Sequence, residues 1–196
     1  MDKPSNRLRQ EIAAAAAQRI AEDGLDYATA KVKAVQQVLG FGHSGLDAMP
    51  DDHEVQLAVR EYQRLFQSDT QPARLRALRE LALDVMKRLD EFPLLLVGAV
   101  ADGTATEHSE VYLQCYIDSS KDVHITLLNQ GVDADADEID NPFGRGRVER
   151  LSFLQGREAV HITCYPPNKA RQIGDHVTTR LDRAALTALL EDGQGP

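Results

Sequence analysis

The first 92 residues carry apolar side chains at the three- and four-residue spacing of amphipathic helices. Glycine and proline interrupt this spacing three times, which divides the stretch into four segments. We expect a helix in each segment, the first beginning near Pro4, then Asp26, Pro50-Asp51 and Thr70. Since each segment has one apolar stripe, the pattern predicts a helical lobe spanning residues 1–92.

At Phe92-Pro93 the pattern changes from helical to extended. Residues 94–100 (LLLVGAV) form a continuous apolar run, as expected of a strand that is covered on both faces. Residues 110–118 (EVYLQCYID) alternate instead, so that Val111 and Leu113 point to one face and Tyr112 and Gln114 to the other. Two strands are therefore expected directly after the helical lobe.

The remaining residues favour a mixture of helix and strand. A short helix is expected over residues 120–129, an extended segment over 132–139 and a loop over 141–147. A hairpin is expected between residues 148–154 and 158–165 with its turn at Gln155-Gly156, followed by a last helix over 181–190. Helices followed by a mixed β-sheet with a C-terminal helix predict an α+β fold, with a second domain over residues 93–196.

Composition narrows the function classes. The formal net charge is −9, which argues against a general nucleic-acid or anionic-membrane binder because neither surface attracts a net anion. Two cysteines are too few for a disulfide scaffold or a thiolate zinc site. Neither a membrane-spanning apolar stretch nor a signal-peptide block is found, so a cytoplasmic location is expected.

The stretch from Gly98 to Leu113 (GAVADGTATEHSEVYL) carries the candidate chemistry. It resembles the signature of the minimal nucleotidyltransferases of the DNA-polymerase-β-like superfamily. Those proteins have a strand ending in Gly-Ser, a short helix with Arg-Gly, and Ser-Asp-x-Asp-Leu opening the next strand. The resemblance covers these residues closely and residues 93–165 in element order. It implies a mixed sheet and nucleotidyl transfer with Mg²⁺ or Mn²⁺ as cofactor.

The chemistry of that signature has a clear physical basis. Two acidic residues at i and i+2 on a strand point to the same face and can share divalent ions, while a glycine turn beside them presents backbone N–H groups to phosphate. The family completes the site with a third carboxylate from a neighbouring strand. In this chain Glu110 matches the first carboxylate.

The other decisive positions depart from the signature. Ala99 replaces the serine after Gly98, and Asp102 replaces the arginine before Gly103. Tyr112 stands where the second carboxylate would be, and a protonated phenol is a poor ligand for a hard cation. The third position falls on Asp133 or on His161, and the expected hairpin favours His161.

With one carboxylate of three, the chain is expected to have lost two-metal catalysis and to serve as a binding or regulatory module. Its pocket is expected on the face of Glu110 and Tyr112, beneath the Gly98-Ala99 turn. The partner would be a protein or a nucleotide-like small molecule. The predicted ligand-binding residues are Gly98, Ala99, Gly103, Ser109, Tyr112, Gln114 and His161.

Two catalytic or metal-binding alternatives stay open at this point. One is an active metal-dependent nucleotidyltransferase that uses Glu110 with Asp133 or Asp135. The other is a transition-metal site in which His108, Glu110 and His161 form a two-histidine, one-carboxylate set.

The two cysteines, Cys115 and Cys164, are interpreted as buried structural thiols. A redox pair is the alternative if their strands are neighbours.

Overall fold

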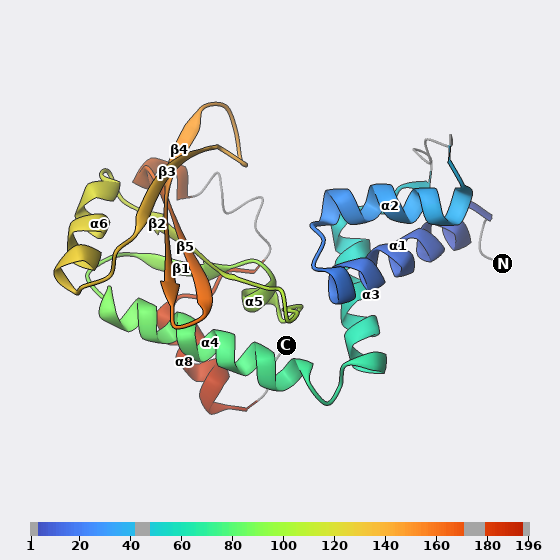
Figure 1. The fold of residues 1–196 in the computed structure, drawn as a ribbon, viewed down its shortest axis with the longest axis horizontal. Helices are drawn as coiled ribbons and strands as arrows, with labels where there is room; N and C mark the ends of the chain where they lie inside the picture. The colour runs from blue at the N-terminus through green and yellow to red at the C-terminus, as the bar shows by residue number, and fades with distance from the viewer. Residues whose placement is uncertain (1–3, 42–47, 171–178, 194–196) are drawn as a thin grey trace. The chain divides into compact units, whose positions relative to one another are not determined.

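The computed structural model describes residues 4–41, 48–170 and 179–193 (Figure 1). All four helices expected in the first part of the chain are confirmed within these residues. They are α1 (Pro4–Asp23), α2 (Tyr27–Leu39), α3 (Asp52–Phe66) and α4 (Gln71–Arg88).

Two of these helices begin where an aspartate caps the backbone. The Asp26 side chain accepts a hydrogen bond from the Thr29 N–H at 2.9 Å at the start of α2. At the start of α3, Asp51 and Glu54 form a reciprocal capping box, with both bonds at 2.8 Å. These bonds satisfy N–H groups that the first helical turn leaves without a partner, which explains why the helices start at these residues.

The contacts divide the chain into two compact units. The first contains residues up to Arg74 together with Thr104–Ser109, and the second contains Leu75–Gly103 together with the residues from Glu110 onward. This division differs from the expected domains 1–92 and 93–196, because most of α4 belongs with the sheet. The buried positions of α4 extend around more of its surface than one stripe, as expected of a helix with neighbours on several sides: Leu75, Leu78, Arg79, Ala82, Leu83, Val85 and Met86.

The first unit is built on α1, α2 and α3, whose buried residues form one apolar cluster that includes Ile12, Val35 and Val55. The segment 104–109 is held to this unit by Gln63, whose amide donates to the carbonyls of Thr104 and Ala105, each at 3.0 Å.

The second unit contains a mixed five-stranded sheet within the described residues. Its strands are β1 (Leu94–Val97), β2 (Val111–Tyr116), β3 (Asp135–Asp140), β4 (Arg147–Gln155) and β5 (Glu158–Tyr165). Their order is β1-β2-β5-β4-β3, with β2 and β5 parallel and the other neighbours antiparallel. Together with the helices this makes the chain an α+β protein, as expected.

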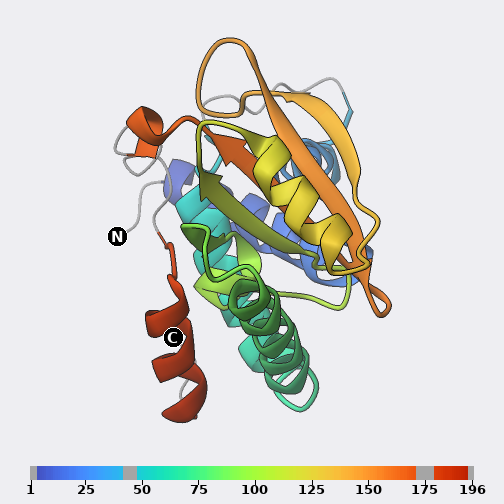
Figure 2. The ribbon, with the colours of Figure 1, turned by 90° about the vertical axis from the view of Figure 1, so that its left-hand side faces the viewer.

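Two further helices of the second unit were expected from the sequence, over residues 120–129 and 181–190, and two shorter ones were not. They are α5 (Ala99–Asp102), α6 (Ser120–Asn129), α8 (Arg183–Glu191) and the short 3₁₀ helix η2 (Pro167–Lys169). Figures 1 and 2 show α4 and α8 beside the sheet, and an ion pair between Asp90 and Arg183 at 3.7 Å connects the ends of these two helices. Among the described residues, no helix combines the length and the apolar character needed to cross a membrane.

Strand lengths are the main correction to the sequence-based expectations. The strand expected over 94–100 ends at Val97, because Gly98 turns the backbone with φ 72° and ψ −159° and the one-turn helix α5 follows. The extended segment expected over 132–139 pairs as a strand only from Asp135. The hairpin of β4 and β5 is confirmed, with Gln155 opposite Glu158.

The two faces of the sheet differ in character. One face carries buried apolar side chains such as Leu113 and Ile162, in agreement with the expected alternation. We call the other the polar face and define it by its register partners: Tyr112, His161 and Ser152; Gln114, Thr163 and Arg150; Tyr116 and Tyr165.

Candidate functional site

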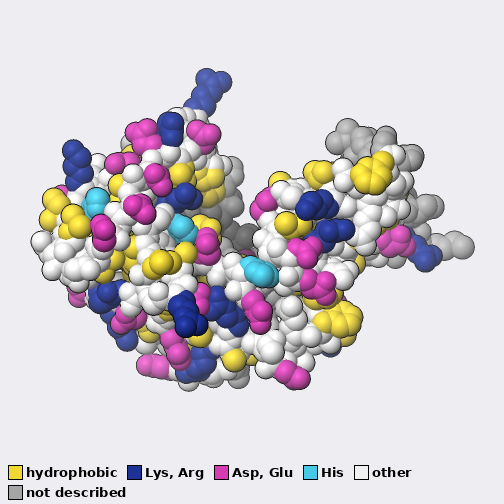
Figure 3. Space-filling model, viewed as in Figure 1, with side chains coloured by type: hydrophobic (Ala, Val, Ile, Leu, Met, Phe, Trp, Pro, Cys, Tyr) yellow, Lys and Arg dark blue, Asp and Glu magenta, His cyan; other side chains and the backbone are white. Residues whose placement is uncertain are grey.

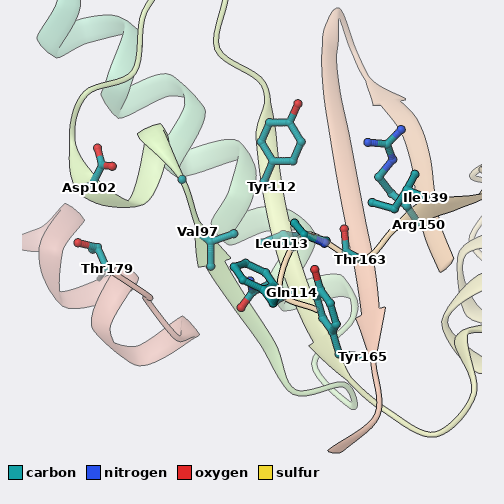
Figure 4. Close-up of a pocket in the computed structure, with 13 residues that line it drawn as sticks. Val97, Asp102, Tyr112, Leu113, Gln114, Ile139, Arg150, Thr163, Tyr165 and Thr179 are labelled. Atoms are coloured by element: carbon teal, nitrogen blue, oxygen red, sulfur yellow. The ribbon is translucent and has the colours of Figure 1, made fainter. Parts of the chain in front are cut away.

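A pocket of about 410 Å³ opens on the polar face (Figure 4). Its size is within the range of small-molecule sites. Gln114 of β2 and Thr163 of β5 lie on this face and are only 4% and 8% exposed. The Gly98 turn borders the pocket, so the pocket lies on the face and beside the turn where we expected it.

Opposite charges lie on opposite sides of this pocket. Figure 4 shows Asp102 and Thr179 on one side and Arg150 on the other, with Tyr112 between them. The Nε of Arg150 is buried and has no hydrogen-bond partner in the described part of the chain. The guanidinium as a whole lines the pocket, so it places a positive charge on that side.

Aromatic side chains line a further part of the pocket. Tyr165 is buried, and its ring lies 6.0 Å from that of Phe143 and 5.9 Å from that of Tyr116, centroid to centroid. The Tyr116 hydroxyl donates to Oε1 of Gln114 at 2.9 Å, which holds that amide in one orientation. Burial raises the pKa of Tyr165 to about 12, so its phenol stays protonated and neutral.

Glu110 lies beside the pocket and accepts two hydrogen bonds on the same oxygen. The Tyr112 hydroxyl donates to Oε2 at 2.9 Å, and Nε2 of His161 lies 3.0 Å from it. The rings of Tyr112 and His161 stack with centroids 4.9 Å apart and planes 21° apart. Burial, followed by the hydrogen bond to Glu110, raises the pKa of Tyr112 to about 12. The three side chains are therefore held in one arrangement.

Ser152 extends this arrangement onto β4, with its Oγ 2.8 Å from Nδ1 of His161. Neither Ser152 nor Arg150 was identified from the sequence pattern. A signal was present, because the expected hairpin pairs residues 148–154 with residues 158–165. In the structure this pairing places Ser152 opposite His161 and Arg150 opposite Thr163.

The predicted ligand-binding residues are only partly brought together. Gly98, Tyr112 and Gln114 line the pocket, and His161 adjoins it through its contact with Tyr112. Ala99 and Gly103, in and after α5, are not among the lining residues. Ser109 belongs to the first compact unit, where its Oγ accepts a hydrogen bond from the Thr106 N–H at 2.8 Å.

The donor set at Glu110 does not fit the two hard divalent ions that the nucleotidyltransferase resemblance implies. The register partner of Tyr112 on β5 is His161. Asp135 lies on β3 opposite Ser152, about 14 Å from Tyr112 at three strand spacings. Asp133 precedes that strand and is exposed. One carboxylate, a phenol and an imidazole remain, and these do not hold two magnesium ions.

The transition-metal set is not assembled either. Nε2 of His108 lies 3.0 Å from the Glu22 carbonyl oxygen, and both residues belong to the first compact unit. Gly24 makes this contact possible, since a Cβ there would lie 2.7 Å from His108. Across the residues described by the structure, no group of three or more His, Cys, Asp or Glu side chains is placed to hold a metal ion.

The two cysteines are register partners on β2 and β5, as the redox alternative required. Both Cys115 and Cys164 are free thiols and buried. A hydrogen bond between them raises the pKa of Cys115 and lowers that of Cys164. Their position on the apolar face of the sheet suits packing, which is the interpretation favoured from the sequence.

No protein-family model matches this chain, and no curated protein sequence matches it. The nucleotidyltransferase resemblance therefore stays a prediction from residues 98–113 and from the order of the elements around them.

Proposed function

We propose that this chain is a nucleotidyltransferase-like binding module that takes a nucleotide-like small molecule in the pocket of the polar face, without two-metal transfer. The observation that carries the proposal is the pocket of about 410 Å³ with Arg150 and Asp102 on opposite sides and aromatic rings along its wall. Aromatic surface suits a planar base, and a guanidinium suits a phosphate oxygen.

The charges favour a ligand with few phosphates. Asp102 stands where the resembling family has an arginine, and its carboxylate repels a polyphosphate at the turn. Arg150 provides one cation on the other side of the pocket. A nucleoside monophosphate can place its phosphate against Arg150 and stay away from Asp102. A triphosphate needs bound cations to neutralise its charge, and the side chains around Glu110 do not hold two such ions.

The acidic character of the surface agrees with a small ligand rather than a polyanion. On the side of the molecule shown in Figure 3, Lys and Arg side chains are interspersed with Asp and Glu and form no continuous basic patch. A nucleic-acid backbone would require such a patch.

Isothermal titration calorimetry tests the proposal with nucleoside monophosphates and the matching triphosphates, each with and without Mg²⁺. We expect a monophosphate to bind with an affinity that Mg²⁺ does not change. Arg150→Met should weaken binding about 10- to 100-fold, the range of a lost hydrogen bond to a charged group. Arg157→Met is the matched control, because Arg157 is exposed at the β4–β5 turn and does not line the pocket.

Two outcomes contradict the proposal. If no monophosphate binds, the pocket does not serve nucleotide-like ligands. If Mg²⁺ promotes triphosphate binding and a labelled nucleotide is transferred in a manner abolished by Glu110→Ala, the chain is an active transferase.

A further inference from the structure

Three side chains of the polar face form a continuous hydrogen-bonded chain that nucleotide binding does not use. Oγ of Ser152 lies 2.8 Å from Nδ1 of His161, and Nε2 of His161 lies 3.0 Å from Oε2 of Glu110. An ionised carboxylate only accepts hydrogen bonds, so Nε2 carries the proton toward Glu110. A neutral imidazole then has its lone pair on Nδ1, and the Ser152 hydroxyl donates to it.

We propose that Ser152 is a nucleophile that attacks small carboxylic esters, with His161 as its general base and Glu110 as the positioning residue. A hydroxyl that donates to an imidazole, which in turn donates to a carboxylate, is the arrangement by which serine hydrolases activate their nucleophile on unrelated folds. This activity goes beyond the proposed binding function and does not depend on it.

The surroundings of Ser152 provide one charge for the transition state. Arg150 and Ser152 are two residues apart on β4 and point to the same face, which places their Cα atoms about 7 Å apart. Backbone N–H groups of β4 take part in pairing with β3 and β5, so the developing oxyanion must be stabilised by a side chain. Arg150 is the cation that shares β4 with Ser152 and lies on the same face, so its guanidinium is the group placed to stabilise the oxyanion.

The reaction needs only ester and water. Oγ of Ser152 attacks the carbonyl carbon while its proton passes to Nδ1 of His161. The carbon–oxygen bond to the alcohol breaks, and the alcohol leaves with the proton from Nδ1. Water then attacks the acyl-serine, gives a proton to Nδ1, and displaces Oγ, which recovers that proton as the carboxylic acid leaves.

The first test uses the whole chain with a fluorophosphonate probe and with p-nitrophenyl acetate. We expect the probe to label Ser152, identified by peptide mass spectrometry, and the ester to be hydrolysed. Ser152→Ala and His161→Gln should each lower the rate at least tenfold, a conservative bound for losing a general base that typically contributes about 100-fold or more. Ser68→Ala is the control, because Ser68 is exposed in the first unit.

The second test separates positioning by Glu110 from a structural role, through the pH dependence of hydrolysis. The rate should fall on acidification, because a protonated imidazole accepts no proton. The groups facing His161 are Glu110 and Tyr112 of β2, Ser152 and Arg150 of β4, and beyond them Asp135 of β3. Glu110→Gln removes the charge that stabilises the imidazolium, so it should move the acid limb of the profile to lower pH as well as lowering the rate. A structural role would lower the rate and leave the limb in place.

The labelling site decides the proposal even if the substituted chains unfold. A probe that reacts elsewhere in the wild-type chain or not at all, or a Ser152→Ala rate equal to that of the wild type, would overturn it. Nucleotide binding is measured separately and without ester, so failure of one proposal leaves the other intact.

Discussion

Arg79 supports the turn that borders the pocket, and replacing it provides a quantitative test of how the second unit is held together. The side chain lies in α4 and is only 3% exposed. Its Nε donates to the Val100 carbonyl at 3.0 Å and its Nη2 to the Ala101 carbonyl at 3.1 Å. Both carbonyls belong to α5, which is one turn long and leaves carbonyl groups without helical partners.

The expected loss in Arg79→Met follows from these contacts. Two charge-assisted hydrogen bonds contribute about 1.5–3 kcal/mol each. Methionine donates no hydrogen bond, so the carbonyl oxygens of Val100 and Ala101 each lose one donor. Burial opposes the charged form of Arg79 and lowers its pKa, with Asp102 acting in the other direction, so part of the loss is offset when the cation is removed. We expect the free energy of unfolding of the second unit to fall by about 2–4 kcal/mol.

Urea unfolding followed by circular dichroism measures this loss, and amide hydrogen exchange in β1 and β2 assigns it to the second unit. Arg76→Met is the matched control on the same helix, because Arg76 is more than half exposed and pairs with Glu80 on the surface. We expect a change below about 0.5 kcal/mol for the control. If Arg79→Met is no more destabilising than Arg76→Met, the two carbonyl contacts do not hold α5 in place.

Two further predictions concern the backbone at the pocket and the two phenols whose pKa is raised. Gly98→Ala should destabilise the second unit by about 1–3 kcal/mol in urea unfolding, because φ 72° with ψ −159° is a conformation that only glycine adopts readily. No atom lies within 4 Å of the added Cβ, so the loss comes from the backbone and not from a steric clash. Gly144→Ala is its control, since Gly144 lacks a positive φ, and an equal loss in both variants would contradict the backbone argument. The free energy of unfolding should also be fully retained below pH 10 and should fall as the pH rises through 12. The reason is that Tyr112 and Tyr165 keep their protons to about pH 12 in the folded chain but lose them near pH 10 when the chain is unfolded. Urea unfolding across this range should show a smaller alkaline loss in Tyr112→Phe than in the wild type, and an identical loss would contradict the raised pKa of this phenol.

Much of the local structure was accessible from the sequence because local chemistry decides it. Asp26 and Asp51 mark the starts of α2 and α3, since a side-chain oxygen at that position satisfies backbone groups of the first turn. The β4–β5 hairpin followed from two alternating segments around a glycine turn, and its register placed Ser152 beside His161. The lengths of β1 and β3 were less accessible, because pairing depends on where the neighbouring strand ends.

By itself, the amino-acid sequence determined the α+β class, the helix starts, the hairpin and the face on which the pocket lies, all of which depend on residue spacing and on groups near in the chain. The tertiary structure decided which distant side chains meet. The parallel pairing of β2 with β5 brings His161 to Glu110 and leaves Asp135 two strands further away. The Gly24 turn draws His108 to α1 in the first unit. Strand order and burial depend on the whole fold. They bring together one carboxylate, one imidazole, two hydroxyl groups and one guanidinium at the site, and no local sequence pattern records these contacts.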